Sequence, residues 1–241
     1  MKYRIASYEL YALAVAAFLI DHVGLYLYDD NLWFRVFRMF ALVWFIPTGY
    51  NAGRKSDLWM WQAALLLAVV GAITGIGPLP LSAVATIILI RMVIDPLAEI
   101  AVRDKFRFWV INAALVALIP ATDEVTEYGT MAAIIALAGW LLKNRDRAAA
   151  VVDVRFYFAY VTALYLGFCA TIFPFNPAQW AVVIVSTVAT AVLMFHFRDM
   201  LLESIRRKNP DIVARACRFI GHNTLQIYTL QLLILQAIYF F

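Results

Sequence analysis

The sequence predicts an all-α, polytopic membrane protein: a helix bundle with about nine transmembrane helices, its N-terminus in the cytoplasm and its C-terminus outside. The first observation behind this prediction is composition. Of the 241 residues, 64% are hydrophobic and 15% are charged, whereas soluble domains are nearer half apolar and a quarter charged. The mean hydropathy is +0.79. The other two observations are a series of long apolar segments and an alternation of charge between the loops that join them.

Apolar segments follow one another along the whole chain, separated by clusters of proline, glycine and charged residues that end helices. A helix needs about 20 mostly apolar residues to cross the hydrocarbon core of a bilayer. Two of the segments, 107–122 and 128–142, are shorter than this. The predicted helical segments are 8–28, 32–51, 58–76, 79–97, 107–122, 128–142, 155–173, 178–197 and 220–240.

The charges of the loops predict the orientation of the chain. With a cytoplasmic N-terminus, all Lys and Arg except Arg35, Arg38 and Arg91 fall in or beside cytoplasmic loops, whereas the outer loops carry acids. This is the distribution expected of a membrane protein, and it leaves no basic stripe for nucleic acid. Residues 198–219 form a basic cytoplasmic segment, in which 205–219 are predicted to lie as a helix on anionic headgroups. The chain 1–241 is predicted to be a single transmembrane domain.

Ionisable side chains within the predicted spans carry the functional signal, because each costs about 2.5–3.5 kcal/mol at membrane depth. Asp21 and His22 lie on the first segment, and Arg35 and Arg38, spaced i,i+3, share one face of the second. Since the second segment returns beside the first, all are expected in the outer half. Histidine can exchange a proton near neutral pH with a carboxylate as its partner, and the arginines can bind an anionic or carbonyl-bearing group. The alternative is a structural ion-pair set of these arginines with Asp29, Asp30 or Asp21.

Other polar residues lie on the fourth and last segments. Arg91 and Asp95, at i,i+4, fit either an intrahelical ion pair or an anion contact in the inner half. Asn223, Tyr228 and Gln231 fit either a polar interior or ordinary hydrogen bonds between helices.

Several kinds of chemistry have no motif in the sequence. It contains no zinc-type cluster, nucleophile elbow or phosphate-binding glycine loop, so no metal site is predicted. His196 and His222 lie at the cytoplasmic ends of their segments, and neither is predicted to be catalytic.

Two motifs resemble known membrane proteins. Leu19-Ile20-Asp21-His22-Val23-Gly24, followed by Phe34-Arg35-Val36-Phe37-Arg38 and an apolar run closing on Gly49-Tyr50, resembles the opening of the TraX-like family. That family is named for a pilin N-acetylase and looks related to the transmembrane acyltransferases. The segment from Ile220 to Tyr228 is similar to their last-helix pattern G-x-N-S/T-L-x-I-Y.

The resemblance implies an acetyltransferase of the bacterial inner membrane. It would move an acetyl group from cytoplasmic acetyl-CoA to an acceptor amine or hydroxyl at the membrane or outer face, the acceptor being a protein N-terminus, a glycan or a small molecule. In this assignment His22 is the catalytic base and Asp21 its partner. The remaining roles are contacts to the acyl donor from Arg35, Arg38 and Arg91, and contacts to the substrate from Asn223, Tyr228 and Gln231.

The sequence departs from the patterns at two positions and leaves two other functions open. Gln231 stands where the last-helix pattern commonly has a histidine, and Tyr11 where larger acyltransferases have an arginine. A proton-coupled transporter or flippase could use Asp21 and His22 as a relay, although no inverted repeat or paired broken helices are present. A noncatalytic scaffold with structural buried charges is the other alternative.

Overall fold

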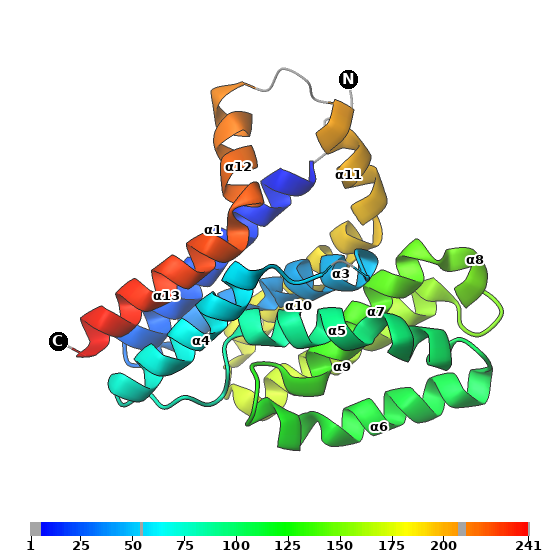
Figure 1. Ribbon diagram of the computed structural model, residues 1–241, viewed down its shortest axis with the longest axis horizontal. Coiled ribbons are helices and arrows are strands. Elements are labelled where there is room, and N and C mark those ends of the chain that lie inside the picture. The colour runs from blue at the N-terminus through cyan, green and yellow to red at the C-terminus, as the bar shows by residue number, and fades with distance from the viewer. Residues whose placement is uncertain (1–5, 54, 207–210, 241) are drawn as a thin grey trace. The chain divides into compact units, whose positions relative to one another are not determined.

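The computed structural model describes residues 6–53, 55–206 and 211–240, and in these ranges all regular elements are helices apart from one isolated bridge between Leu81 and Thr126 (Figure 1). The predicted all-α class is therefore confirmed. Lys2, Arg4, Arg54 and the Arg207-Lys208 pair, which contribute to the predicted charge alternation, lie outside the described residues. The helices are α1 (Ser7–Leu27), α2 (Leu32–Arg35), η1 (Val36–Ala41), α3 (Leu42–Tyr50), α4 (Leu58–Ile73), α5 (Ala83–Ala101), α6 (Lys105–Asp123), α7 (Gly129–Lys143), α8 (Arg145–Ala148), α9 (Val154–Ile172), α10 (Pro177–Phe195), α11 (Phe197–Arg206), α12 (Ile212–His222) and α13 (Thr224–Phe240).

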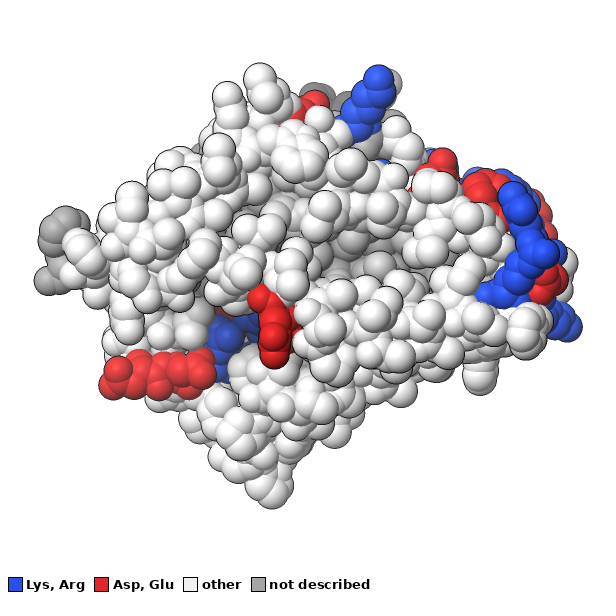
Figure 2. Space-filling model, turned by 60° about the horizontal axis from the view of Figure 1, so that its bottom comes forward, with Lys and Arg blue, Asp and Glu red and all other residues white. Residues whose placement is uncertain are grey.

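Five helical segments among the described residues are long and apolar enough to cross a membrane: α1, the run from Leu32 to Tyr50, α6, α9 and α10. Helices α4, α7 and α13 are apolar but shorter. The 15 residues of α7 extend about 22 Å, less than the roughly 30 Å of a bilayer core. Figure 2 shows one face of the molecule on which charged side chains gather at a few places and the rest is uncharged. These features indicate a membrane protein.

The tertiary contacts divide the chain into two compact units. Unit 1 contains residues 1–43 and 172–241, and so brings together the two ends of the sequence. Within it α1 packs against α12, α13, α2 and η1, while α10 packs on η1. Unit 2 contains residues 44–171, in which α7 packs against α5 and α6.

The predicted segment 32–51 is helical but not a uniform α-helix. The Asn31 side chain accepts a hydrogen bond from the Trp33 backbone at 3.0 Å and begins α2, which ends after four residues. Residues Val36–Ala41 then continue as the 3₁₀-helix η1. Side chains three residues apart eclipse one another in a 3₁₀-helix, so Arg35 and Arg38 are presented on the same side.

The basic segment 198–219 contains two helices rather than one helix over 205–219. Helix α11 extends to Arg206, and α12 begins after Asp211, whose carboxylate accepts a hydrogen bond from the Ala214 backbone at 2.7 Å. A carboxylate at this position satisfies a backbone N–H of the first turn, which explains the new helix start. The exposed apolar residues Ile212, Val213 and Phe219 lie on α12, as expected of an amphipathic helix at a membrane surface.

Helix α7 is the buried centre of unit 2, and small residues allow its backbone to touch that of α3. A Cβ added to Gly139 would lie 1.8 Å from the Ile46 carbonyl oxygen, and one added to Gly49 would lie 1.7 Å from the Ala136 carbonyl oxygen. Real Cβ atoms do not approach backbone so closely. The two helices can therefore pack at this distance only with glycine at both positions, as small residues at membrane helix crossings allow.

We expect Gly139→Ala to lower the free energy of unfolding by about 1–3 kcal/mol, because the added methyl group would clash with the backbone of Ile46. Thermal unfolding in detergent micelles would measure the change. Gly167→Ala is the matched control, since nothing lies within 4 Å of a Cβ at that helical position and alanine favours helix by about 1 kcal/mol over glycine. Equal stability of Gly139→Ala and wild type would contradict this account of the crossing.

The two ends of α5 are held by different contacts. At its start, Leu81 exchanges backbone hydrogen bonds with Val125 and Glu127 at 2.8 and 2.9 Å, and the Glu127 carboxylate accepts a hydrogen bond from the Ala83 backbone at 3.0 Å. At its other end, Glu99 accepts a hydrogen bond from Arg147 of α8 at 2.6 Å. The loop before α5 therefore meets the loop between α6 and α7, whereas the end of α5 meets α8.

Candidate functional site

The candidate site is built on the last two turns of α1, in unit 1. Asp21 and His22 are both buried there, with relative accessibilities of 0% and 2%. Helix α2 reaches this part of α1 because Gly24 has no side chain: an added Cβ would lie 2.1 Å from the Cβ of Phe34. The close approach at Gly24 brings Arg35, the next residue after Phe34, beside Asp21.

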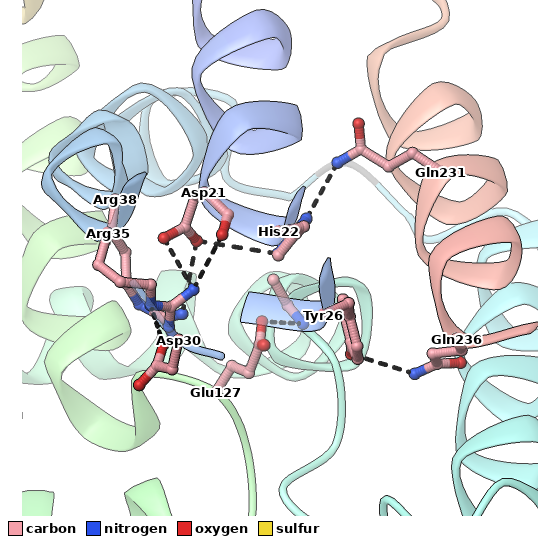
Figure 3. A network of polar contacts seen from close by, with 10 residues as sticks. Asp21, His22, Tyr26, Asp30, Arg35, Arg38, Glu127, Gln231 and Gln236 are labelled. Carbon is pink, nitrogen blue, oxygen red and sulfur yellow. Dashed lines mark hydrogen bonds and ion pairs between the residues drawn. The ribbon is translucent and has the colours of Figure 1, made fainter. Parts of the chain in front are cut away.

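Arg35 lies between two carboxylates (Figure 3). Its Nη1 is 2.8 Å from Asp21 Oδ1 and its Nε is 2.9 Å from Asp30 Oδ1. Nη1 also donates to the Asp21 backbone carbonyl at 3.3 Å, and the guanidinium lies 5.3 Å from the ring centroid of Phe173. Two opposite charges and an aromatic face stabilise the buried guanidinium. Arg35 is therefore held firmly in place.

Arg38 approaches the same carboxylate from η1, with its Nη1 3.8 Å from Asp21 Oδ2. Asp21 is thus shared by two guanidinium groups. The Arg38 side chain is 15% accessible, compared with 6% for Arg35. Of the two arginines, Arg38 is the one that a second molecule can reach more easily.

The imidazole of His22 has a polar neighbour at each ring nitrogen. Its Nδ1 is 3.1 Å from Gln231 Nε2 on α13, and its Nε2 is 4.0 Å from Asp21 Oδ2. The rings of Phe18 and Tyr228 lie 5.9 and 5.5 Å from its centroid. A side-chain amide can donate to a histidine nitrogen or accept from it, so the orientation of Gln231 selects the tautomer of His22. The second polar atom of this amide, Oε1, is buried without a hydrogen-bond partner among the described residues.

The structure therefore brings six of the predicted site residues together within unit 1. Asp21, His22, Arg35, Arg38, Tyr228 and Gln231 form one cluster in unit 1. Asn223 instead donates to the Phe219 carbonyl at 2.8 Å where α12 ends, eight residues and about 12 Å of helix from Gln231.

Arg91 belongs to unit 2, as does Asp95. Arg91 Nη1 lies 3.2 Å from the Met60 sulfur, and the Asp95 carboxylate accepts a hydrogen bond from the Trp140 indole at 2.9 Å. The assignment of Arg91 to the acyl donor stays a prediction.

Two polar residues near the cluster, Tyr26 and Gln236, were not predicted from the sequence as site residues. Gln236 Nε2 is 3.5 Å from the Tyr26 hydroxyl, one helical turn beyond the His22–Gln231 pair. Tyr26 follows His22 by four residues, and Gln236 follows Gln231 by five. This nearly equal spacing could have suggested a second polar layer between α1 and α13. The Oε1 atom of Gln236, like that of Gln231, is buried without a hydrogen-bond partner among the described residues.

Comparison with known proteins adds no assignment: no family model, curated protein or solved structure matches this chain. Within the described ranges, no three His, Cys, Asp or Glu side chains are grouped so that they could hold a metal ion. The chemistry of the site thus has to be inferred from the cluster itself.

Proposed function

We propose that this chain is an integral membrane acetyltransferase of the bacterial inner membrane. It moves an acetyl group from cytoplasmic acetyl-CoA to an acceptor amine or hydroxyl at the membrane or outer face. One observation carries the proposal: a buried histidine, hydrogen-bonded by Gln231, lies beside a carboxylate shared by Arg35 and Arg38. The resemblance to the TraX-like family, through the residues of this same cluster, gives the reaction.

The donor set fits acyl transfer, which needs a base for the acceptor and a hydrogen-bond donor for the carbonyl oxygen on which negative charge develops. Acetyl-CoA supplies the acetyl group as a thioester. In the structure the Gln231 amide presents its Nε2, a donor, to His22 Nδ1. For the reaction we propose that this amide turns over, so that its Oε1 accepts from Nδ1–H and the lone pair of His22 lies on Nε2, the nitrogen nearer Asp21. The base nitrogen then lies on the side of the ring nearer Asp21, the carboxylate that Arg35 and Arg38 share.

In this mechanism His22 Nε2 takes the proton of the acceptor amine or hydroxyl. At the same time the nitrogen or oxygen of the acceptor forms a bond to the acetyl carbon of acetyl-CoA. Arg38, the more accessible arginine, donates to the carbonyl oxygen. His22 then returns the proton to the sulfur as the carbon–sulfur bond breaks. Asp21 and Arg35 act as positioning residues, because Arg35 is already held by Asp21 and Asp30.

The proposed topology has nine crossings, a cytoplasmic N-terminus and an outer C-terminus. Contacts within each unit support it, because they join loops that the charge pattern assigns to one side of the membrane. Leu81, at the predicted outer end of the segment 79–97, pairs with Val125 in the next predicted outer loop. Glu99 pairs with Arg147 between two predicted inner loops. In unit 1 the start of α1 meets α11, where the Ser7 backbone donates to Ser204 at 2.9 Å.

Purified protein in lipid vesicles tests the function directly. With acetyl-CoA and a panel of acceptors (a peptide with a free N-terminus, an amino sugar and a neutral glycan), we expect release of the coenzyme thiol together with an acetylated product. A thiol reagent measures the first and mass spectrometry the second. If no thiol is released with any acceptor, while the vesicles accumulate a solute in a proton-dependent manner, the chain is a transporter instead.

A further inference from the structure

A second polar site lies in unit 2, where α5 ends. A cavity of about 440 Å³ opens there, lined by Glu99, Val102, Arg103 and Arg147. These residues come from the end of α5, from the turn that follows it and from α8. None of them belongs to the cluster around His22.

Arg147 is fixed in orientation at this cavity. Its Nη1 and Nη2 both bond the Glu99 carboxylate, the first at 2.6 Å, and its guanidinium lies 5.5 Å from the ring centroid of Trp140. A guanidinium has five N–H groups, and this paired contact uses one on each terminal nitrogen. The remaining N–H groups of Arg147 can therefore serve a ligand without loss of the contact to Glu99.

The cavity carries a net positive charge. The hydrogen bond from Arg147 is the largest effect on the Glu99 carboxyl and lowers its pKa. Desolvation raises the pKa by a smaller amount, and the nearby charges of Arg147 and Arg103 lower it further. Glu99 is thus ionised at neutral pH and balances one arginine. Arg103 is exposed, and in the described part of the chain no carboxylate lies within ion-pair distance of it. Outside the lining, the exposed cations Lys143 and Arg145 precede Arg147 in the chain, and the exposed acids Asp104 and Asp146 adjoin Arg103 and Arg147. At the right-hand edge of the view in Figure 2, basic and acidic side chains lie close together.

We propose that this cavity binds a phosphate group between Arg103 and Arg147. A guanidinium matches phosphate oxygens with two parallel N–H donors. The cavity lining has one carboxylate, Glu99, and two guanidinium groups, so the positive charge of Arg103 is available to pair with a bound anion. The phosphate can belong to the headgroup of an anionic phospholipid or to a free phosphorylated molecule such as coenzyme A. The site does not require the proposed acetyl transfer, and its test does not use that activity.

Two binding measurements distinguish the sources. The full-length protein in nanodiscs of zwitterionic phosphatidylcholine is titrated with coenzyme A by calorimetry. Separately, protein purified from membranes containing phosphatidylglycerol is analysed for retained lipid by native mass spectrometry. Arg103→Gln is expected to weaken the binding of the recognised phosphate about tenfold, equivalent to the loss of one charge-assisted hydrogen bond. Glu99→Gln, which removes the competing negative charge, is expected to strengthen it.

Lys105→Gln is the matched control, because Lys105 is an exposed cation near the same end and does not line the cavity. Binding of coenzyme A that depends on Arg103 and not on Lys105 supports a free phosphate as the ligand. Retention of phosphatidylglycerol with the same dependence supports a lipid headgroup. The proposal is overturned if wild-type protein binds neither, or if Lys105→Gln weakens binding as much as Arg103→Gln does at the same ionic strength.

Discussion

His22→Ala is expected to lower acetyl transfer by about 10²–10⁴-fold, the usual contribution of a positioned general base. Activity falls because the variant lacks the imidazole that takes the acceptor's proton. The decrease should therefore appear in kcat/KM for acetyl transfer at neutral pH. His22→Gln should show the same loss although its amide can still reach a polar neighbour. Helical circular dichroism and the unfolding temperature in detergent would show that both variants remain folded.

His196→Gln is the control for this prediction. His196 lies 3.6 Å from Asp199 and its side chain is 61% exposed, so its replacement should leave acetyl transfer unchanged. A folded His22→Ala protein with full acetyl transfer would rule out the assignment of His22 as the base. It would favour a role for the buried cluster in stability alone.

Gln231 provides a finer test of the same assignment. If it accepts the Nδ1 proton of His22, then Gln231→Glu, whose carboxylate also accepts, should retain much of the activity. Methionine has a side chain of similar length but cannot accept the Nδ1 proton in the same way. The Gln231→Met protein should therefore lose acetyl-transfer activity while it stays folded. A purely structural role for Gln231 predicts the opposite order, because methionine is the less costly of the two side chains to bury.

The second large effect concerns stability: Asp21→Asn is expected to lower the free energy of unfolding by about 3–5 kcal/mol. The reason is that Asp21 is fully buried and lies near two guanidinium groups, and removal of one partner leaves buried charge uncompensated. Denaturant titration in mild detergent would measure this change. The loss should be independent of any substrate.

Replacing both Asp21 and Arg35, and disrupting the exposed ion pair of Asp199 with His196, are the comparisons for Asp21→Asn. Asp21→Leu combined with Arg35→Met should recover part of the lost stability, since apolar residues of similar volume often replace a buried ion pair at little cost. The recovery should be incomplete, because Arg38 still loses the Asp21 carboxylate and Asp30 still loses the Arg35 guanidinium. Asp199→Asn, which disrupts the exposed pair with His196, should cost less than about 1 kcal/mol. Stability of Asp21→Asn equal to that of wild type would show that the shared carboxylate does not hold the arginines in place.

The local features of this protein could be predicted from its sequence. Each of the predicted apolar segments contains a helix, because helix formation depends on nearby residues and on the breaker clusters between them. The meeting of Asp21 with Arg35 and Arg38 was also predictable, since consecutive helices joined by a short turn return beside one another. The residues at that turn have positive φ at Asp29 and Asp30, a conformation that aspartate tolerates.

What only the tertiary structure decided are the contacts between residues distant in the chain. Gln231 lies 209 positions after His22, and no local pattern shows that α13 returns beside α1 and reaches this histidine. The partners of Arg35, the burial of α7 and the cavity between Glu99 and Arg147 likewise depend on which helices pack together. Sequence by itself determined the helices, the apolar surface and the residues too costly to bury without a partner. Packing of non-consecutive helices determined the partners, because side chains from separate helices meet only when the whole unit is assembled.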